Sequence, residues 1–255
     1  MKRLALIPFV FALVTAAGMS LSPDSGAMYH RVVLIVVALA TAISAFVTMT
    51  RFVREDRLYA CWLLIGAGYS LAGVRYILRV ITLLTGTTFP QPVLNVMLIL
   101  QNVAIAGALW LFVRAWRATG LAAPGSRSAQ VVSTIAGVVV AIVVGGYPLA
   151  KGIANASADL VLLVSTLGDM VGLALIVPLM MSALAMRGGL LMHTWVYLAA
   201  SEVAWLCYDI WYAIRPELAL AMPTGRGIEE GIRVIAVLFA FAATVAQRRA
   251  IRADS

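Results

Sequence analysis

Acidic, basic and aromatic side chains recur at helical spacing in the second half of the chain. One set has the spacing i, i+3, i+7 and i+10, and consists of Glu202, Trp205, Asp209 and Tyr212. In an α-helix, residues at these intervals share one face, so the set forms a single stripe. Arg75 and Arg79, four residues apart, form a second stripe earlier in the chain. Acids and bases arranged in this way can pair across helices or bind a charged ligand.

The sequence around these residues is far more apolar than that of a soluble domain. Of its 255 residues, 63% are hydrophobic and 12% are charged, and the mean hydropathy is +0.99. Soluble domains carry about 25% charged residues. Half the usual charge cannot cover a water-exposed surface, so the composition predicts that most of the surface faces lipid.

Eight apolar stretches approach the length of about 20 residues that a helix needs to cross the hydrocarbon core of a membrane. The first is Leu4–Leu21. The other seven are Met28–Thr50, Leu58–Leu83, Val93–Val113, Gln130–Ala150, Asp159–Met186, Leu190–Ile214 and Ile228–Ala246. We therefore expect an all-α fold, a polytopic membrane helix bundle with seven core transmembrane helices. Residues 28–247 would form this single domain, and residues 248–255 a short basic cytoplasmic tail.

The N-terminal segment, residues 1–27, has two interpretations. Lys2 and Arg3 precede an apolar run and then small residues, which is the pattern of a cleaved secretory signal peptide. The same run is also just long enough for an uncleaved first transmembrane helix. Both interpretations give the seven core helices the same orientation.

The seven core stretches divide into three helices, one linker helix and three further helices. Trp62 lies near the start of the second helix of the first triplet, and Trp195 takes the corresponding place in the second triplet. With the linker helix between them, the two triplets would run parallel, as in transporters built from parallel repeats. In architecture alone, this layout resembles small sugar transporters, and the seven-helix form resembles bacterial seven-helix sensor modules.

Basic residues indicate the orientation of the chain. Lysines and arginines are concentrated at one set of alternate connections and at the C-terminal end, where they include Arg51, Arg54, Arg57, Arg248 and Arg249. Cytoplasmic loops carry such an excess of basic residues. We therefore expect a multi-pass protein of the cell membrane with a cytoplasmic C-terminus. The alanine-rich, lysine-poor composition favours a bacterial inner membrane.

Polar residues inside the stretches cost about 2.5–3.5 kcal/mol each on insertion when they are charged, so their depth is informative. Asp169 and Glu202 fall near the middle of the membrane, and the others fall between the midplane and the outer surface. The inner halves of the same helices are almost purely apolar. We expect a polar pocket open to the outside and lined by five helices. Its candidate ligand- or proton-binding residues are Asp169, Glu202, Asp209, Arg75, Arg79, Asn102, Gln101, Trp205, Tyr212 and Arg233.

These residues also fit a purely structural role, in which interhelical ion pairs fix the packing. Arg79, Glu229 and Glu230 lie outermost and can reach interfacial water, so for them the structural role is favoured. Asp169 and Glu202 are too short to reach water from mid-membrane. At that depth a carboxyl group suits proton coupling or cation binding, which favours a functional role.

The sequence does not bring together the residues that haem binding, metal binding or catalysis would need. His30 and His193 would lie at opposite membrane faces, about 25–30 Å apart, so they cannot hold one haem together. We interpret both as interfacial residues. Cys61 and Cys207 lie inside apolar stretches, and the sequence contains no cysteine motif, phosphate loop or nucleophile–base pair. We expect no cofactor, no metal site, no nucleic-acid partner and no enzymatic activity.

Three functions remain. A sensor or ligand-binding module is favoured because the expected pocket is one-sided. It would bind a small ligand and signal through a protein partner or as a homo-oligomer. The alternative is a small, proton-coupled solute transporter using Asp169 and Glu202, although alternating access favours polar groups in both halves. The third is an accessory subunit of a membrane complex.

Overall fold

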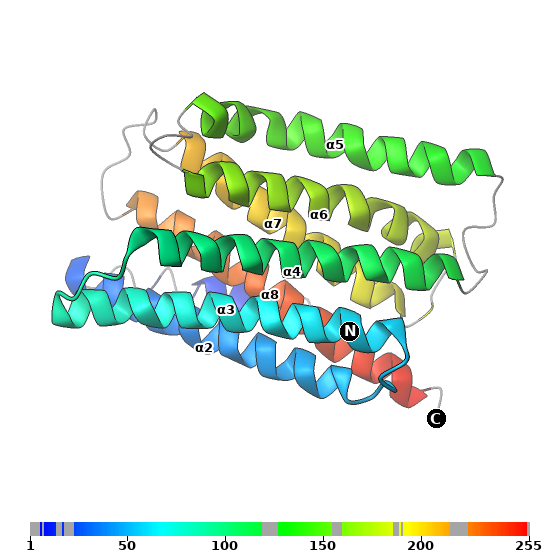
Figure 1. Ribbon diagram of the computed structural model, residues 1–255, viewed down its shortest axis with the longest axis horizontal. Helices are drawn as coiled ribbons and strands as arrows, with labels where there is room; N and C mark the ends of the chain where they lie inside the picture. Colours follow the sequence, from blue (N-terminus) through cyan, green and yellow to red (C-terminus); the bar gives the residue numbers. More distant parts are fainter. Residues whose placement is uncertain are drawn as a thin grey trace.

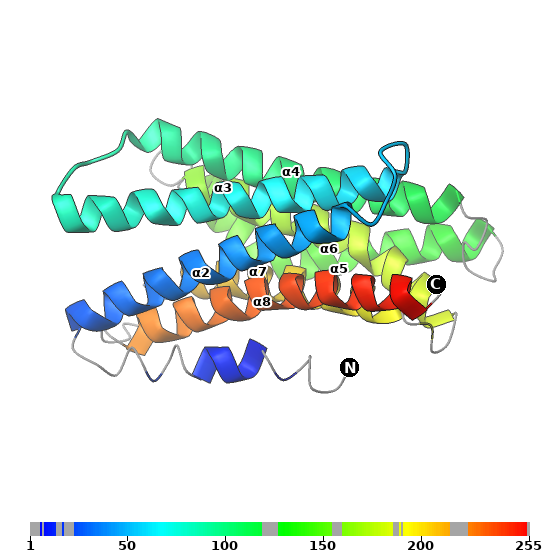
Figure 2. The ribbon, with the colours of Figure 1, turned by 90° about the horizontal axis from the view of Figure 1, so that it is seen from below.

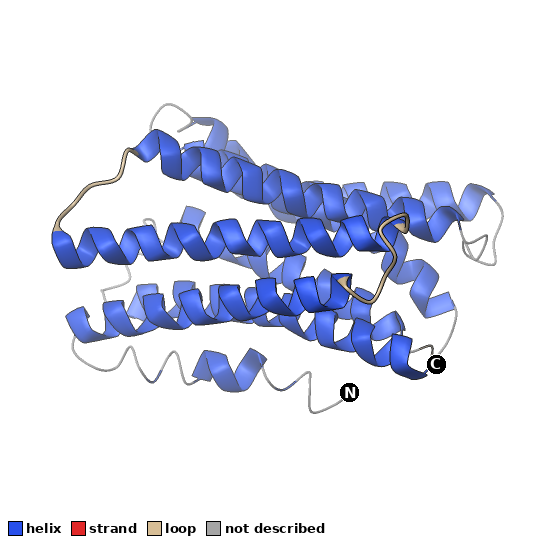
Figure 3. Ribbon diagram, turned by 60° about the horizontal axis from the view of Figure 1, so that its bottom comes forward, coloured by secondary structure: helices blue, strands red, loops and turns tan. Residues whose placement is uncertain are grey.

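The computed structural model describes residues 6, 8–13, 17, 23–118, 127–154, 160–185, 189, 191–214 and 224–253, and no strand occurs among them (Figure 3). Seven long antiparallel helices form a bundle (Figure 1). They are α2 (Pro23–Met49), α3 (Arg57–Thr85), α4 (Gln91–Ala118), α5 (Arg127–Ala154), α6 (Leu160–Ala185), α7 (Leu191–Ile214) and α8 (Thr224–Ala253). The all-helical bundle is therefore confirmed, and each of the seven core stretches corresponds to one of these helices.

Two helix ends differ from the sequence prediction. Helix α2 begins at Pro23, five residues before the expected start at Met28. Proline suits the first helical position because the amide hydrogen that it lacks has no partner there anyway. Helix α8 continues to Ala253 through most of the predicted tail of 248–255. The guanidinium group of Arg248 donates to Oγ of Ser44 on α2, which ties this part of α8 to the bundle.

The N-terminal stretch Leu4–Leu21 lies largely outside the described residues. Residues 8–13 form a short helical piece. It lies beside α8 (Figure 2), where the ring of Phe9 packs edge-to-face on that of Phe239 with 5.9 Å between centroids. Whether residues 1–27 are a signal peptide or a transmembrane helix stays a prediction.

Six helices form a closed ring, and α5 lies outside it. The ring order is α2, α3, α4, α6, α7, α8, and it closes because α8 packs against α2. The first triplet, α2 to α4, meets the second, α6 to α8, at the α4–α6 and α2–α8 contacts. Helix α5 packs only on α6 and α7, at the edge of the bundle in Figure 1. The arrangement is that of two triplets joined by a peripheral linker helix.

Five of the described helices are long and apolar enough to cross a membrane, over Met28–Met49, Arg57–Thr85, Gln91–Ala115, Val131–Ala154 and Leu162–Met180. Their outward faces carry large apolar side chains, most clearly on α5, where Val132 is 64% exposed and Val143 is 75% exposed. Such a surface is costly in water and suits lipid. The molecule is a helical membrane bundle.

Helix α3 is held in place along its length. The carboxylate of Asp56 accepts a hydrogen bond from the amide of Leu58 at 2.8 Å and caps the first turn. At the other end Gly86, with φ of 69°, takes the left-handed conformation that terminates a helix. Between them Gly66 leaves no room for a side chain, because an added Cβ would lie 2.6 Å from the ring of Phe46. These features fix the positions of the charged residues on α3.

The two ends of the bundle differ. We call the end where residues 86–90 connect α3 to α4 the α3–α4 end. The opposite end, with the α2–α3 connection and the end of α8, is the arginine end. Near it three buried rings form an aromatic plug, in which Phe112 meets Trp62 and Trp195 edge-to-face at 5.3 and 5.0 Å. The plug joins α3, α4 and α7 across the ring.

On the other side of the arginine half, buried hydroxyl groups join α2 to α8. The hydroxyls of Ser44 and Thr244 are hydrogen-bonded to each other, and Arg248 donates to Oγ1 of Thr48 at 2.8 Å. Thr244 and Gln247 are both buried on α8. Helix α8 therefore carries buried polar groups toward the arginine end. Its polar groups are accommodated because they bond to α2 and do not face lipid.

Candidate functional site

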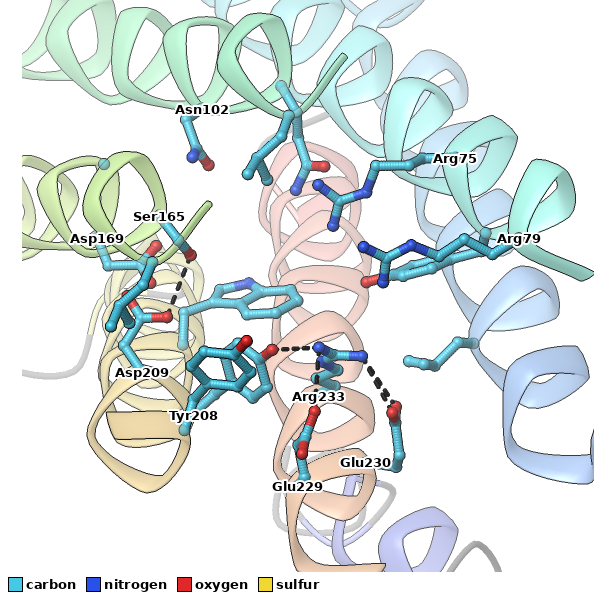
Figure 4. A pocket seen from close by; sticks show the side chains of 18 of the residues that line it. Arg75, Arg79, Asn102, Ser165, Asp169, Tyr208, Asp209, Glu229, Glu230 and Arg233 are labelled. Atoms are coloured by element: carbon cyan, nitrogen blue, oxygen red, sulfur yellow. Dashed lines mark hydrogen bonds and ion pairs between the residues drawn. The ribbon is translucent and has the colours of Figure 1, made fainter. Parts of the chain in front are cut away.

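A cavity of about 500 Å³ lies inside the ring, toward the α3–α4 end. Six of the described helices line it, and none of the described lining residues comes from α5. Side chains from α3, α4, α6, α7 and α8 converge on it (Figure 4). All ten residues singled out from the sequence line this one cavity, although they come from five different helices. They are Arg75, Arg79, Gln101, Asn102, Asp169, Glu202, Trp205, Asp209, Tyr212 and Arg233.

Arg233 of α8 is the best-connected charge in the cavity. Its guanidinium nitrogens lie 3.3 Å from Oε1 of Glu229 and 3.0 Å from Oε1 of Glu230. The same group donates to the hydroxyl of Tyr208 and lies 4.3 Å from the centroid of its ring. Nε2 of His30, on α2, reaches Glu230 at 3.3 Å. This network ties α8 to α2 and α7 (Figure 4).

Three carboxyl groups form the wall of the cavity that α6 and α7 provide. Asp169 and Asp209 lie next to each other (Figure 4), and Ser165 donates to Oδ1 of Asp209 at 3.1 Å. The second oxygen of each aspartate, Oδ2, is buried without a hydrogen-bond partner. Glu202 packs on Gly172 of α6, where any larger residue would collide with its carboxylate. We call Asp169, Glu202 and Asp209 the acidic wall, and no ion pair joins any of them to a basic residue that the structure describes.

The opposite wall belongs to α3 and α4. Arg75 is 8% exposed, lies over the ring of Tyr76 at 5.8 Å, and leaves its Nε without a partner. Arg79 follows one turn later on the same face. From α4, Gln101 leaves its Oε1 unpartnered, whereas Asn102 donates to the carbonyl of Val164 at 3.4 Å. The basic wall, Arg75 and Arg79, forms no ion pair with any carboxylate that the structure describes.

Nothing matches this chain among models of known protein families, curated proteins or solved structures.

The sequence interpretation missed the contribution of α2. His30 was expected at the interface, but it is 4% exposed and pairs with Glu230. Glu229 and Glu230 were expected to reach interfacial water, and both are instead buried beside Arg233. A sixth helix therefore lines the cavity, where five were expected. The spacing of His30 and Leu34, one helical turn apart, was the available signal, because both turn to the same side.

The other histidine lies far from the cavity. His193 is in the first turn of α7 at the arginine end, half-buried and near the ring of Tyr197. No group of three or more His, Cys, Asp or Glu residues is placed to hold a metal ion within the described part of the chain. The chemistry that the cavity offers is therefore recognition of charge, by four arginines and five acids among its lining residues.

Proposed function

We propose that the protein is an integral membrane sensor or ligand-binding module of the bacterial inner membrane. Its cavity would open to the outer side and accept a small polar ligand, and binding would be passed to a partner protein. The observation that carries this proposal is the one-sided cavity. Its lining combines buried charges whose polar atoms lack partners with a volume typical of small-molecule sites, about 300–1,000 Å³.

The packing of the arginine half supports a sensor. The aromatic plug of Trp62, Phe112 and Trp195 is buried, and the hydroxyl groups between α2 and α8 are bonded across that interface. A solute path through the bundle would have to separate these contacts. A sensor needs no such path, because binding only has to shift the ring helices relative to one another.

The proposed topology has seven spans with the C-terminus in the cytoplasm. Helices α7 and α8 contain 24 and 30 residues and lie antiparallel among the five apolar spans. At about 1.5 Å per residue both are long enough to cross. Arg51, Arg54 and Arg249 are exposed at the arginine end, as expected for the cytoplasmic side. These exposed cations would also suit an acidic surface on the partner.

Ligand binding and transport can be separated with the purified full-length chain. We expect members of a polar metabolite library to raise its unfolding temperature in nanodiscs, and Asp209→Asn to abolish this shift. Lys151→Gln, on α5 outside the cavity, is the matched control and should keep the shift. In proteoliposomes the same metabolites should not be carried. Flux that disappears in both Asp169→Asn and Glu202→Gln would contradict the sensor.

A small, proton-coupled transporter is the second candidate. The adjacent carboxyl groups of Asp169 and Asp209 favour it, since two acids at one site can exchange a proton as a cation binds or leaves. The two helix triplets around a central cavity also agree with this function. A pH gradient that drives uptake of a stabilising metabolite would establish the transporter. Co-purification of one stoichiometric protein, with both substitutions silent, would instead favour a subunit of a complex.

A further inference from the structure

The charges of the cavity are divided between two walls. The basic wall of Arg75 and Arg79 is on α3, and the acidic wall of Asp169, Glu202 and Asp209 is on α6 and α7. Figure 4 shows Arg75 and Arg79 across the cavity from Asp169 and Asp209, with the Arg233 network lower in the view. Charges of opposite sign in a buried site normally pair directly, so their separation requires an explanation.

Arg233 forms no ion pair with the acidic wall. Its nitrogens are occupied by Glu229, Glu230 and the hydroxyl of Tyr208. Among the described residues, no hydrogen bond or ion pair holds the carboxylate of Glu202. Asp209 is 1% exposed and its Oδ2 has no partner. Within the described part of the chain, therefore, no cation forms an ion pair with these three carboxyl groups.

The two arginines of the basic wall likewise form no ion pair among the described residues. The guanidinium group of Arg75 is almost fully buried, with Nε unpartnered and only an aromatic ring within cation–π distance. Arg79 is its neighbour on the helix, so two like charges face the cavity without an anion. Guanidinium groups bind carboxylate and phosphate through paired hydrogen bonds, which are among the strongest available. No carboxylate among the residues that the structure describes therefore pairs with Arg75 or Arg79.

We propose that the cavity binds a zwitterion, a molecule with one ammonium group and one carboxylate or phosphate group. The anionic group lies at Arg75 and Arg79, and the ammonium group lies at Asp169, Glu202 and Asp209. This inference rests on the proposed ligand-binding function and names its ligand class. Four arginines and five acids line the cavity, so a ligand without net charge leaves the site nearly balanced.

A series of ω-amino acids tests the proposal, because it varies the distance between the two charges in small steps. The full chain in phosphatidylglycerol nanodiscs would be titrated with glycine, 4-aminobutyrate, 6-aminohexanoate and 8-aminooctanoate, and affinity measured by calorimetry. Hexanoate and hexylamine are matched probes that each carry one charge. We expect affinity to peak at one chain length, and each single-charge probe to bind at least about tenfold more weakly than the best zwitterion.

Substitutions assign each charge to its wall. Arg75→Gln should weaken the best ω-amino acid at least about tenfold without weakening hexylamine, and Asp209→Asn should weaken it without weakening hexanoate. Arg79→Gln replaces Arg75→Gln if that variant does not fold. Lys151→Gln, a lost cation outside the cavity, should change nothing. Equal loss of all probes in the wall variants would overturn the proposal.

Two sources can supply the zwitterion, and lipid composition distinguishes them. A free solute would bind in phosphatidylglycerol nanodiscs with or without added phosphatidylethanolamine. A lipid headgroup would raise the unfolding temperature when phosphatidylethanolamine is present and would displace the ω-amino acid. Both results support the shared chemistry. If the single-charge probes bind as tightly as the zwitterion, the zwitterion proposal is overturned, but the proposed ligand-binding function is not. If no ω-amino acid binds but members of the metabolite library do, only the zwitterion proposal is overturned. If neither set binds, the proposed ligand-binding function is overturned as well.

Discussion

Arg233 lies at the centre of a network of polar groups from α8, α7 and α2. It contacts Glu229 and Glu230 on α8 and Tyr208 on α7, and His30 of α2 reaches Glu230. Removing one partner of a buried ion pair is far more costly than replacing the whole set, because it leaves an uncompensated charge.

Arg233→Gln is therefore expected to lower the free energy of unfolding by about 3–5 kcal/mol. Chemical unfolding in mixed detergent micelles would measure the change. The triple variant Glu229→Gln, Glu230→Gln, Arg233→Gln should recover part of the loss, since it leaves no unpaired charge. Equal stability of Arg233→Gln and the parent would mean that the network contributes nothing to the fold.

Gly172 makes room for the carboxylate of Glu202 on the surface of α6. Gly172→Ala would push this side chain aside, and overpacking of this kind costs about 1–3 kcal/mol. The cost should disappear in a Glu202→Ala background, where the colliding atoms are gone. Gly146→Ala is the control, because no atom lies within 4 Å of its Cβ position. An equal cost in both backgrounds would exclude the collision as the cause.

Residue types and spacing were sufficient to find most of the charged residues that line the cavity, but not the contacts between helices. The i, i+3, i+7 spacing on α7 places Glu202, Trp205 and Asp209 on one face in any helix. Arg233 meets Glu229 and Glu230 of its own helix, and their spacing of three and four residues already allows this. Which residues of α2 and α7 join them depends on how these helices rotate against α8, and no pattern within one helix specifies that. Thr41, Ser44 and Thr48 of α2 share a face in the same way, yet their partners are on α8.

At the level of helices, the aromatic plug separates the cavity from the arginine end. Phe112 of α4 is fully buried between Trp62 and Trp195, each of which belongs to the second helix of its triplet. The two tryptophans suggested a repeat in the sequence. In the fold both contact the same ring, so their correspondence has a packing role.

Phe112→Ala should destabilise the bundle by about 3–5 kcal/mol, because it leaves a cavity between fixed neighbours. It should also raise the rate at which N-ethylmaleimide labels Cys61, which is buried beside Trp62 on α3. Cys207→Ser removes the other thiol from the assay. Phe239→Ala, a phenylalanine outside the plug, is the control. Unchanged labelling of Cys61 in Phe112→Ala would contradict a sealing role.

The hydropathy of the sequence was sufficient to predict where the helices lie. It was not sufficient to predict where they end, because the ends depend on particular side-chain contacts. Long apolar runs identify α3 and α4 because about 20 apolar residues are the length of a helix that crosses the hydrocarbon core, whereas a strand needs about half as many. The end of α8 is different, since its last turns contain Gln247, Arg248 and Arg249 and read as a polar tail. They remain helical where α2 supplies acceptors for Arg248, a contact between residues about 200 positions apart that hydropathy does not contain.

For the whole molecule, the proposed orientation can be measured with single cysteines in a Cys61→Ser, Cys207→Ser background. Thr87, between α3 and α4, and Glu55, between α2 and α3, are both exposed. We expect a membrane-impermeant maleimide to label Thr87→Cys in intact cells, and Glu55→Cys only after permeabilisation. The reverse pattern would place the cavity on the cytoplasmic side and would contradict an outward-facing sensor.

Helix α5 touches only α6 and α7, and none of the described residues lining the cavity belongs to it. Judged by contacts alone it could be dispensable. In the proposed topology of seven spans, however, α5 sets the direction of the second triplet. One crossing between α4 and α6 lets both triplets enter the membrane from the same side. Without α5, the second triplet would insert upside down. The acids on α6 and α7 would then lie in the opposite leaflet from Arg75, and the two halves of the site could never meet.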